Sequence, residues 1–456
     1  MKKLFVVFIL LLLFVTVIFS QNKNSFLIQD ITFDGKVKRY VTMDLNNDSI
    51  EEIITFTEEG KNKNAQHYIN ICWQVDGSFS NNSVQKFRPP AEMIIFDFGD
   101  VTIDPGKEFV FLTSNGIYYY TLNSSARYDL NKKFLFKAPT ILRNSDKENI
   151  CYWDFVRDIT NDGKAEVLVP QFNNYLIYSV DDTSGWQNPS RLRIRTKTDI
   201  GVFNRLSVNY QSLDLNFADC NSDGSADIIA RDEDIFYIFY QQENGAFPRN
   251  PDMTFDMKFK DTEKSNEEIN VHTLKDINGD GLLDMLATKI SASESILNPQ
   301  SQIQIYLGKK NSNRLFSLKP DQIIISSGVH FEEQLLDFNN DKKMDLAMPS
   351  IKLGLMRIIK MLLTKSATIG IKIYQMNEQG LYPESPDLEK KLTLSFSFGV
   401  SENSANASGT FPVFELNGDF NGDDNDGKSD IIITYHKQDD STENLSKTIR
   451  VLMNQI

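Results

Sequence analysis

A short acidic phrase returns seven times along the chain, and its side chains are of the types that bind hard metal ions. Most copies carry oxygen-bearing side chains at positions one, three and five and a closing carboxylate at position nine. This spacing lets a coiled loop surround a cation with roughly six to eight oxygens, the coordination that calcium prefers. Position six needs a tight turn with positive φ, which glycine reaches freely and proline cannot. The phrase therefore predicts a series of calcium sites.

Two copies meet every requirement, because each also has glycine at position six, Gly224 in one and Gly281 in the other. Their predicted ligands are Asp219, Asn221, Asp223 and Asp227 in one copy, and Asp276, Asn278, Asp280 and Asp284 in the next. A third copy consists of Asp158, Thr160, Asp162 and Glu166 with Gly163, and here a threonine hydroxyl replaces a stronger ligand. These three loops are the best candidates for calcium.

Four copies depart from the pattern. Ser49 and Lys342 stand in for the glycine in two of them, so weaker binding is expected there. The predicted ligands of these two are Asp44, Asn46, Asp48 and Glu52, and Asp337, Asn339, Asp341 and Asp345. In the last copy, residues 424–426 separate Asp419, Asn421 and Asp423 from the closing Asp430, so its loop bulges or binds in another register. The copy that starts at Asp100 carries Pro105 at position six and is expected to be metal-free or weakly occupied.

The alternative is that these segments are ordinary polar turns, because Asp, Asn and Gly are common turn residues. Seven copies in phase favour metal binding over this alternative, since clustered carboxylates repel one another without a counter-ion. A helix-loop-helix calcium motif is the other option for such a loop. It is disfavoured because β-branched residues typical of strands follow, for example Ile228 and Ile229.

The elements that carry these loops also repeat. Successive copies start 56, 58, 61, 57, 61 and 82 residues apart, a spacing typical of propellers and solenoids. Alternating apolar runs of strand length, broken by Gly, Asn and Asp, provide four short strands in each unit. We therefore expect an all-β fold, a seven-bladed β-propeller of four-stranded antiparallel blades. Only two strands follow the last phrase, so an extra N-terminal strand over 26–33 is expected to complete the last blade.

The repeat resembles the FG-GAP or VCBS repeat of bacterial secreted proteins and is similar to the propeller of integrin α-subunits. The resemblance covers residues 21–456. It implies that the loop between the first two strands of a blade holds calcium. It does not identify a partner, because such propellers serve in adhesion, glycan binding and occasionally polysaccharide cleavage.

The N-terminus has the layout of an export signal over residues 1–20, with Lys2 and Lys3 before an apolar run from Leu4 to Phe19. An uncleaved membrane anchor is the alternative, because this apolar run is long for a signal. Either option predicts a secreted, periplasmic or cell-surface protein. The formal charge of −14 disfavours nucleic acid and anionic membranes as partners and suits divalent cations.

The longest interval contains an insertion between the second and third strands of the sixth unit. Residues 351–365 have a helical pattern in which Arg357, Lys360 and Thr364 share a narrow polar face beside a broad apolar one. Strand alternation places this inserted helix at the opposite end of the blade from the calcium loops. Two interpretations remain open: a flap that packs over the central channel, or a docking surface for a partner or a membrane.

The resemblance implies a non-catalytic, calcium-binding interaction or adhesion module, with a glycan-binding or polysaccharide-cleaving propeller as the alternative. The four histidines belong to no recognisable nucleophile or metal constellation. They are His67, His272, His330 and His436. The partner is expected to be a protein or a glycan, with membrane contact through 351–365 or an uncleaved signal as a further option.

Overall fold

The computed structural model describes most of the chain after the N-terminal segment. The described residues are 26–60, 65–75, 78–143, 150–181, 185–202, 206–259, 267–291, 300–310, 314–327, 329–330, 334–352, 355–364, 366–395, 397–400, 407–410, 414–415, 430–435 and 447–454. The predicted signal over 1–20 lies outside them, as do Asp419, Asn421, Asp423 and His436. None of the described helices is long and apolar enough to cross a membrane.

Six blades follow one another along the described part of the chain, each an antiparallel sheet whose strands occur in chain order. The first two are β2 (Lys36–Met43), β3 (Glu52–Glu59), β4 (Gln66–Val75) and β5 (Ser78–Phe87), then β6 (Ile95–Gly99), β7 (Glu108–Thr113), β8 (Gly116–Leu122) and β9 (Tyr128–Phe136). The next two are β10 (Val156–Arg157), β11 (Glu166–Gln171), β12 (Asn174–Tyr178) and β15 (Ser190–Leu192), then β18 (Leu215–Ala218), β19 (Asp227–Asp232), β20 (Ile235–Phe239) and β21 (Met253–Asp256).

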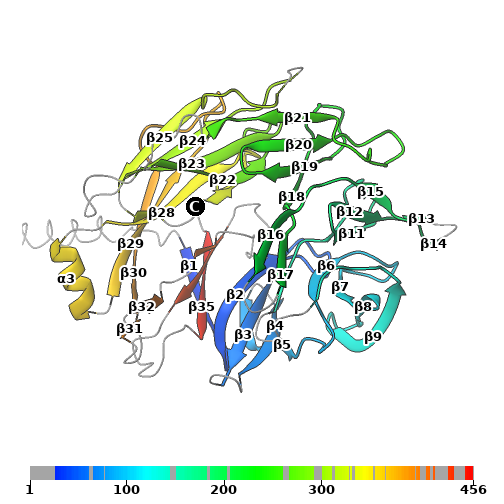
Figure 1. Ribbon diagram of the computed structural model, residues 1–456. Helices are drawn as coiled ribbons and strands as arrows, with labels where there is room; N and C mark the ends of the chain where they lie inside the picture. The colour runs from blue at the N-terminus through cyan, green and yellow to red at the C-terminus, as the bar shows by residue number, and fades with distance from the viewer. Residues whose placement is uncertain are drawn as a thin grey trace, which may run out of the picture.

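The fifth blade has β22 (Glu267–Lys275), β23 (Asp284–Ser291), β24 (Gln300–Tyr306) and β25 (Gln322–Ser327). The sixth has five strands, because its first strand is divided into β26 (Val329–His330) and β27 (Gln334–Leu336), both paired with β28 (Asp345–Ile351). It continues with β29 (Ser366–Tyr374) and β30 (Leu388–Ser395). The sheets are arranged around a centre, which defines the fold as an all-β propeller (Figure 1).

A further sheet joins the two ends of the described chain. Its strands are β1 (Phe26–Thr32), β35 (Thr448–Asn454), β34 (Ile431–Tyr435) and β33 (Phe414–Glu415), in that order. The N-terminal strand pairs antiparallel with the last strand, from Phe26 opposite Asn454 to Thr32 opposite Thr448. The expected pairing of the N-terminal strand with the end of the chain is confirmed, whereas the expected number of seven blades is wrong for the described residues, which form six blades and this composite sheet. The extra residues 424–426 of the last phrase fall outside the described part of the chain.

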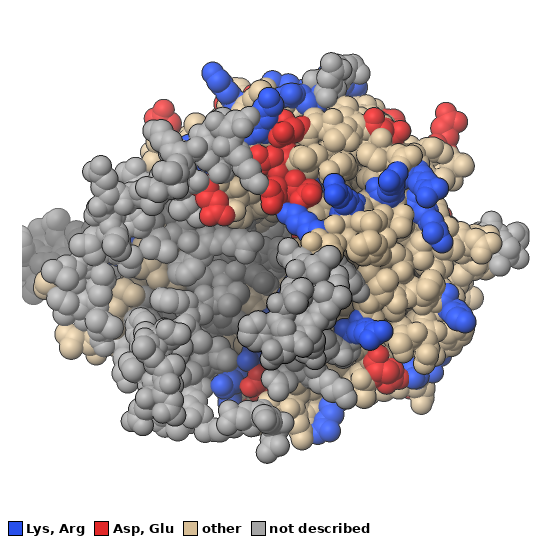
Figure 2. Space-filling model, viewed as in Figure 1, with Lys and Arg blue, Asp and Glu red and all other residues tan. Residues whose placement is uncertain are grey.

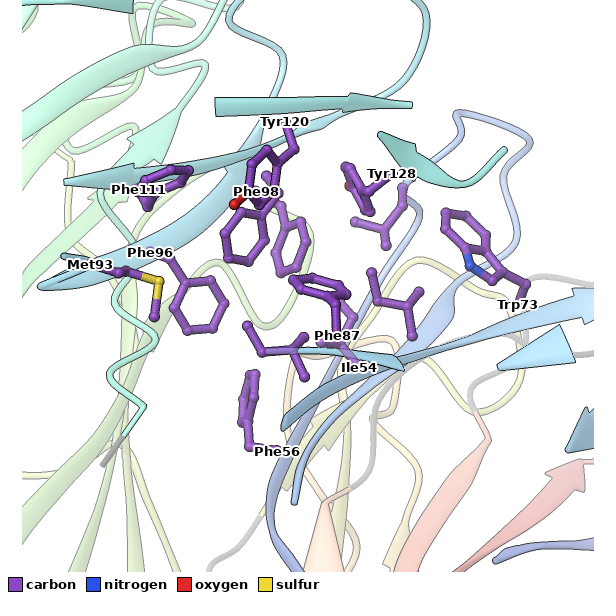
Figure 3. Close-up of a cluster of buried hydrophobic side chains, with 14 residues drawn as sticks. Ile54, Phe56, Trp73, Phe87, Met93, Phe96, Phe98, Phe111, Tyr120 and Tyr128 are labelled. Carbon is purple, nitrogen blue, oxygen red and sulfur yellow. The ribbon is translucent and has the colours of Figure 1, made fainter. Parts of the chain in front are cut away.

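Hydrophobic clusters hold neighbouring sheets together. One cluster packs Phe56 of β3 and Phe87 of β5 against Phe96 of the second blade (Figure 3). Phe109 belongs to the same cluster, and its ring centroid lies 5.0 Å from that of Phe96. A comparable cluster joins each later pair of blades up to the sixth. The composite sheet packs on the first blade, where Tyr40 donates its hydroxyl hydrogen to the carbonyl of Ile432 at 3.0 Å. These contacts cover both faces of the inner strands, so β7 is buried along its whole length.

Smaller elements connect or flank the blades. Three hairpins among the described residues lie outside the blades, formed by β13 (Val180–Asp181) and β14 (Gly185–Trp186), β16 (Lys197–Val202) and β17 (Leu206–Gln211), and β31 (Ser397–Val400) and β32 (Ala407–Thr410). Helix α3 (Leu355–Thr364) lies between β28 and β29. The helix is shorter than the expected 351–365 because Ile351 belongs to β28, where it pairs with Val329. Figure 1 shows α3 at the outer edge of the molecule, so it does not form the flap over the central channel.

Candidate functional site

The acidic phrases occupy one repeated place in the fold. In each of the six blades the phrase forms the loop between the first and second strands, and its closing carboxylate starts the second strand. These closing residues are Glu52, Glu108, Glu166, Asp227, Asp284 and Asp345. Because successive strands are antiparallel, all six loops lie at the same end of their blades. The seventh closing residue, Asp430, is buried just before β34, while its other predicted ligands lie outside the described residues.

Five of these loops share one pattern of internal hydrogen bonds. The backbone N–H of position six donates to the carboxylate at position one, at 2.8 to 2.9 Å, in the loops that start at Asp44, Asp158, Asp219, Asp276 and Asp337. The N–H of position seven donates to the carboxylate at position five, at 2.8 to 3.0 Å. The sequence therefore folds each loop around its own acidic side chains, as turn-forming Asp and Asn residues do.

The side chains at positions one, three and five converge. In the loop that starts at Asp219, the N–H of Asp223 lies 3.3 Å from Asp219 Oδ1 and 2.9 Å from Asn221 Oδ1. Asn221 also donates from Nδ2 to Asp223 Oδ2 at 2.8 Å. The same amide-to-carboxylate contact occurs between Asn46 and Asp48 at 2.9 Å. Three oxygen-bearing side chains are thus gathered at the tip of the loop, as a site for a hard cation requires.

Position six adopts positive φ in these five loops, whatever residue it carries. The values are 85° at Gly163, 89° at Gly224 and 79° at Gly281, and 70° at Ser49 and 68° at Lys342. The substituted loops therefore keep the conformation of the others and carry a backbone strain of about 1–2 kcal/mol at this residue.

Position four also has positive φ, which the sequence analysis missed. The residues concerned are Asn47, Asn161, Ser222, Gly279 and Asn340. The signal was present in the sequence, because Asn and Gly are the residues that adopt this conformation most readily.

The loop that starts at Asp100 has a different conformation. Its positive φ falls on Gly106, at position seven, and Ile103 at position four is fully exposed. Asp104 donates its N–H to the Thr102 hydroxyl at 3.1 Å. Pro105 explains the difference, because its ring fixes φ near −65° and removes the N–H that position one accepts elsewhere.

The closing carboxylates are buried and act as braces within the blade. In all six blades the carboxylate accepts the backbone N–H of position two, for example Leu45 to Glu52 at 2.8 Å. The three Asp copies use their second oxygen to accept an N–H just after the third strand, as Asp284 does from Gly308 at 2.7 Å. The two Glu copies with Thr at position three instead accept its hydroxyl, as Glu108 does from Thr102 at 2.6 Å. Sequence spacing alone did not indicate this second role.

Burial raises the pKa of every one of these closing groups. The pKa of Glu52 rises to about 8, chiefly through burial, with smaller contributions from the Asp48 and Asp44 carboxylates. The pKa of Asp284 rises to about 7 and that of Asp227 to about 6 for the same main reason. A bound cation at the loop would favour the charged form, because an opposite charge nearby stabilises a carboxylate.

The loops supply oxygen donors of the right type, and their side chains already converge. Within the described part of the chain, however, no group of three or more His, Cys, Asp and Glu side chains is close enough to hold a metal ion. In each loop the third donor is an amide or a hydroxyl, and the closing carboxylate is engaged by backbone N–H groups. The donor set fits calcium, which accepts amide and backbone carbonyl oxygens, and does not fit zinc or another metal held by nitrogen or sulfur.

The end of the blades opposite the acidic loops contains cavities. Four cavities are formed there by residues that precede first strands or connect second to third strands. One, of about 390 Å³, is lined by Tyr152 and Trp153 together with Gln171, Gln211 and Asp214. Another, of about 470 Å³, carries Arg231 and Lys197 beside Asp214, Asp234 and Glu268. Figure 2 shows acidic side chains gathered in the upper centre of its view, with basic ones around them.

A further buried carboxylate, Asp97, lies on β6 and ties the second blade to the third. It accepts N–H bonds from Phe98 at 2.8 Å, Phe155 at 2.7 Å and Val156 at 2.8 Å. Burial raises the pKa of Asp97 to about 8, with the Asp154 carboxylate adding to the shift. Its three backbone donors and its buried position indicate a structural role between blades.

Comparison with known proteins identifies no family. No protein-family model matches the chain, and no curated protein matches it. Among 125 matching chains of solved structures is a lectin from Agrocybe aegerita, described for recognition of non-reducing terminal N-acetylglucosamine, with a TM-score of 0.43 and 9% identity over 79% of this chain and 86% of the lectin. BBS1N, solved in complex with ARL6DN, has a TM-score of 0.40 and 9% identity over 94% of this chain and 97% of that one. Hsv2 of Kluyveromyces lactis has a TM-score of 0.32 and 9% identity over 75% of this chain and 70% of its own.

Proposed function

We propose that this chain is an extracytoplasmic, calcium-stabilised β-propeller of the FG-GAP or VCBS kind, acting as a non-catalytic interaction or adhesion module. The observation that carries the proposal is the shared architecture of five loops, which place converging oxygens at the same end of five blades. The recurrence of one set of side-chain contacts in five blades supports a common role for these loops.

In this proposal the side chains at positions one, three and five of each loop hold the cation, together with the carbonyl of position seven. A bound calcium ion would offset the repulsion between these carboxylates and fix the loop against the start of the second strand. The closing carboxylate would contribute its charge and keep its bonds to backbone N–H groups. The loop of Asp100 would remain without a strong site, because it lacks the shared contacts.

We also propose that the composite sheet serves as a seventh blade and closes the ring. Its packing on the first blade through Ile31, Tyr40, Ile53, Ile432 and Ile449 supports this role. Pairing of the two chain ends protects strand edges that would otherwise be open to association.

The opposite end of the blades is the proposed interaction surface. The cavities found there and the absence of a recognisable catalytic set in the sequence support binding over chemistry. The test is a binding screen of the chain without residues 1–20 against glycan arrays and envelope proteins, in calcium and in chelator. The proposal expects a ligand whose binding is lost on chelation and on mutation of cavity residues; hydrolysis of a glycan in the screen would contradict the non-catalytic role.

A glycan ligand is the second candidate, favoured by the cavity that contains Tyr152 and Trp153. An aromatic face beside amide and carboxylate side chains, here Gln171, Gln211 and Asp214, is an arrangement that can stack on a sugar and accept its hydroxyl hydrogens. Trp153→Ala should then abolish glycan binding, while the same change at Trp186, outside this cavity, should not. Equal loss in both variants would speak against this cavity as the site.

A further inference from the structure

A second candidate site is a cavity between helix α3 and the sixth blade. It has a volume of about 310 Å³ and is walled by the ends of β28, β29 and β30 and by one side of the helix. Among the described residues, five basic side chains line it, against one carboxylate, Glu389. The basic residues are Lys352, Arg357, Lys360, Lys372 and Lys391. The cavity therefore has a positive net charge, whereas the whole chain has a formal charge of −14.

Most of this positive charge is not neutralised within the described residues. Lys391 lies 3.7 Å from Glu389, and Lys372 donates to the Ser326 hydroxyl at 3.2 Å. Lys352, Arg357 and Lys360 form no ion pair with any residue that the structure describes. Burial and the neighbouring Lys352 ammonium lower the pKa of Lys372, so this lysine lies in an environment that disfavours further positive charge. An anion in the cavity would relieve this repulsion.

The helix beside the cavity also exposes large apolar side chains. Met356 is 76% and Leu363 is 80% exposed. Arg357, Lys360 and Met361 line the cavity, so the polar side of α3 faces it while Met356 and Leu363 lie on another side of the helix. A basic group next to protruding apolar residues is the combination by which interfacial helices bind anionic membranes.

We propose that this cavity, formed by α3 and the sixth blade, binds the phosphate of an anionic lipid headgroup while Met356 and Leu363 enter the membrane interface. Arg357 can contact two phosphate oxygens at once, and the lysines add point charges from the strands. The overall negative charge of the molecule would repel such a membrane, so contact would be confined to this edge of the propeller. The inference does not depend on calcium in the loops, because no acidic phrase lines this cavity.

The test is co-sedimentation with vesicles of phosphatidylcholine alone and with added phosphatidylglycerol. The wild type should bind only the anionic vesicles. Arg357→Glu with Lys360→Glu should weaken this binding by roughly thirtyfold or more. The matched control is Arg191→Glu with Arg193→Glu, which makes the same charge change at exposed residues of another blade. Circular dichroism confirms that each variant is folded.

Three further arms identify the ligand. Met356→Gln with Leu363→Gln keeps good helix formers and should weaken vesicle binding without changing the binding of sulfate, measured by calorimetry. Binding of sulfate that depends on Arg357 and Lys360, with no vesicle binding, would keep the oxyanion site and overturn the lipid assignment. Vesicle binding that is lost in chelator and unaffected by the charge reversal would mean calcium bridging and overturn the proposal. Equal vesicle binding by the charge reversal and its control would also overturn it.

Discussion

At the scale of single residues, the decisive position is the sixth of each acidic loop. Gly224 and Gly281 have φ of 89° and 79°, and a Cβ added at either would meet no atom within 4 Å. The requirement for glycine is therefore purely conformational and not steric. Lys342, at φ 68°, meets the same requirement at a cost in strain.

Gly224→Ala and Gly281→Ala should each lower the free energy of unfolding by about 1 kcal/mol, because alanine is strained at positive φ. Urea unfolding in chelator measures this without a contribution from calcium. The control is Gly370→Ala in β29, whose φ is not positive and whose added Cβ would lie 3.6 Å from Glu389 Oε1. Loss of stability in all three variants alike would contradict the conformational argument.

The buried closing carboxylates predict how stability depends on pH when calcium is removed. Burial raises the pKa of Glu52 to about 8 and that of Asp284 to about 7, above the value near 4 of an unfolded chain. The folded state then holds more protons than the unfolded state, so stability should be greatest at low pH and decrease as pH rises from about 4 to 8. The melting temperature in chelator should fall across this window, and Glu52→Gln should reduce the slope.

Calcium should reverse this trend, because the cation favours the ionised carboxylates. The stabilisation that calcium provides should therefore grow as pH rises. A melting temperature in chelator that rises from pH 5 to pH 8 would show that the closing carboxylates are not protonated in the metal-free fold.

At the scale of elements, the strand that joins the chain ends is the most informative. On β1, Ile31 is 1% exposed and packs between the composite sheet and the first blade, whereas Leu27 on the same strand is 51% exposed. Asp30 accepts two hydrogen bonds from the Arg450 guanidinium, at 2.8 and 3.0 Å, which fixes the register with β35. The strand thus contributes both packing and alignment.

Ile31→Ala should destabilise the protein by about 2–4 kcal/mol, because it removes buried methyl groups and leaves a cavity. Leu27→Ala, on the exposed face of the same strand, should change stability by less than about 0.5 kcal/mol. Thermal unfolding of both variants provides the comparison. Similar melting temperatures for the two would mean that β1 is peripheral and that the ring does not depend on it.

At the scale of the whole molecule, the propeller and the place of the acidic loops were predictable from the sequence. The fixed spacing of the phrases and the alternating strands between them specify a repeated antiparallel unit. The failure of the Asp100 loop to match the others followed from Pro105 alone. These features are local, so the sequence carries them directly.

Other features depend on long-range contacts and were missed or wrong. The division of the first strand of the sixth blade into β26 and β27 was missed, and the count of seven blades was wrong, although the pairing of the N-terminal strand with the last strand was predicted. The position of α3 at the outer edge also could not be read from its amphipathic pattern, which fits a flap equally well. Asp284 also accepts a hydrogen bond from the Gly308 N–H. This second role could be predicted only with the knowledge that two loops meet at the end of the blade.

The central claim is that the acidic loops hold calcium, and bound calcium measured by equilibrium dialysis tests it most directly. Asp223→Asn and Asp280→Asn should each remove about one calcium ion per chain, because each takes a charged ligand from a single loop. Asp104→Asn, in the loop with Pro105, should remove none. Bound calcium that is absent from the wild type, or that is the same in all three variants, would contradict the account.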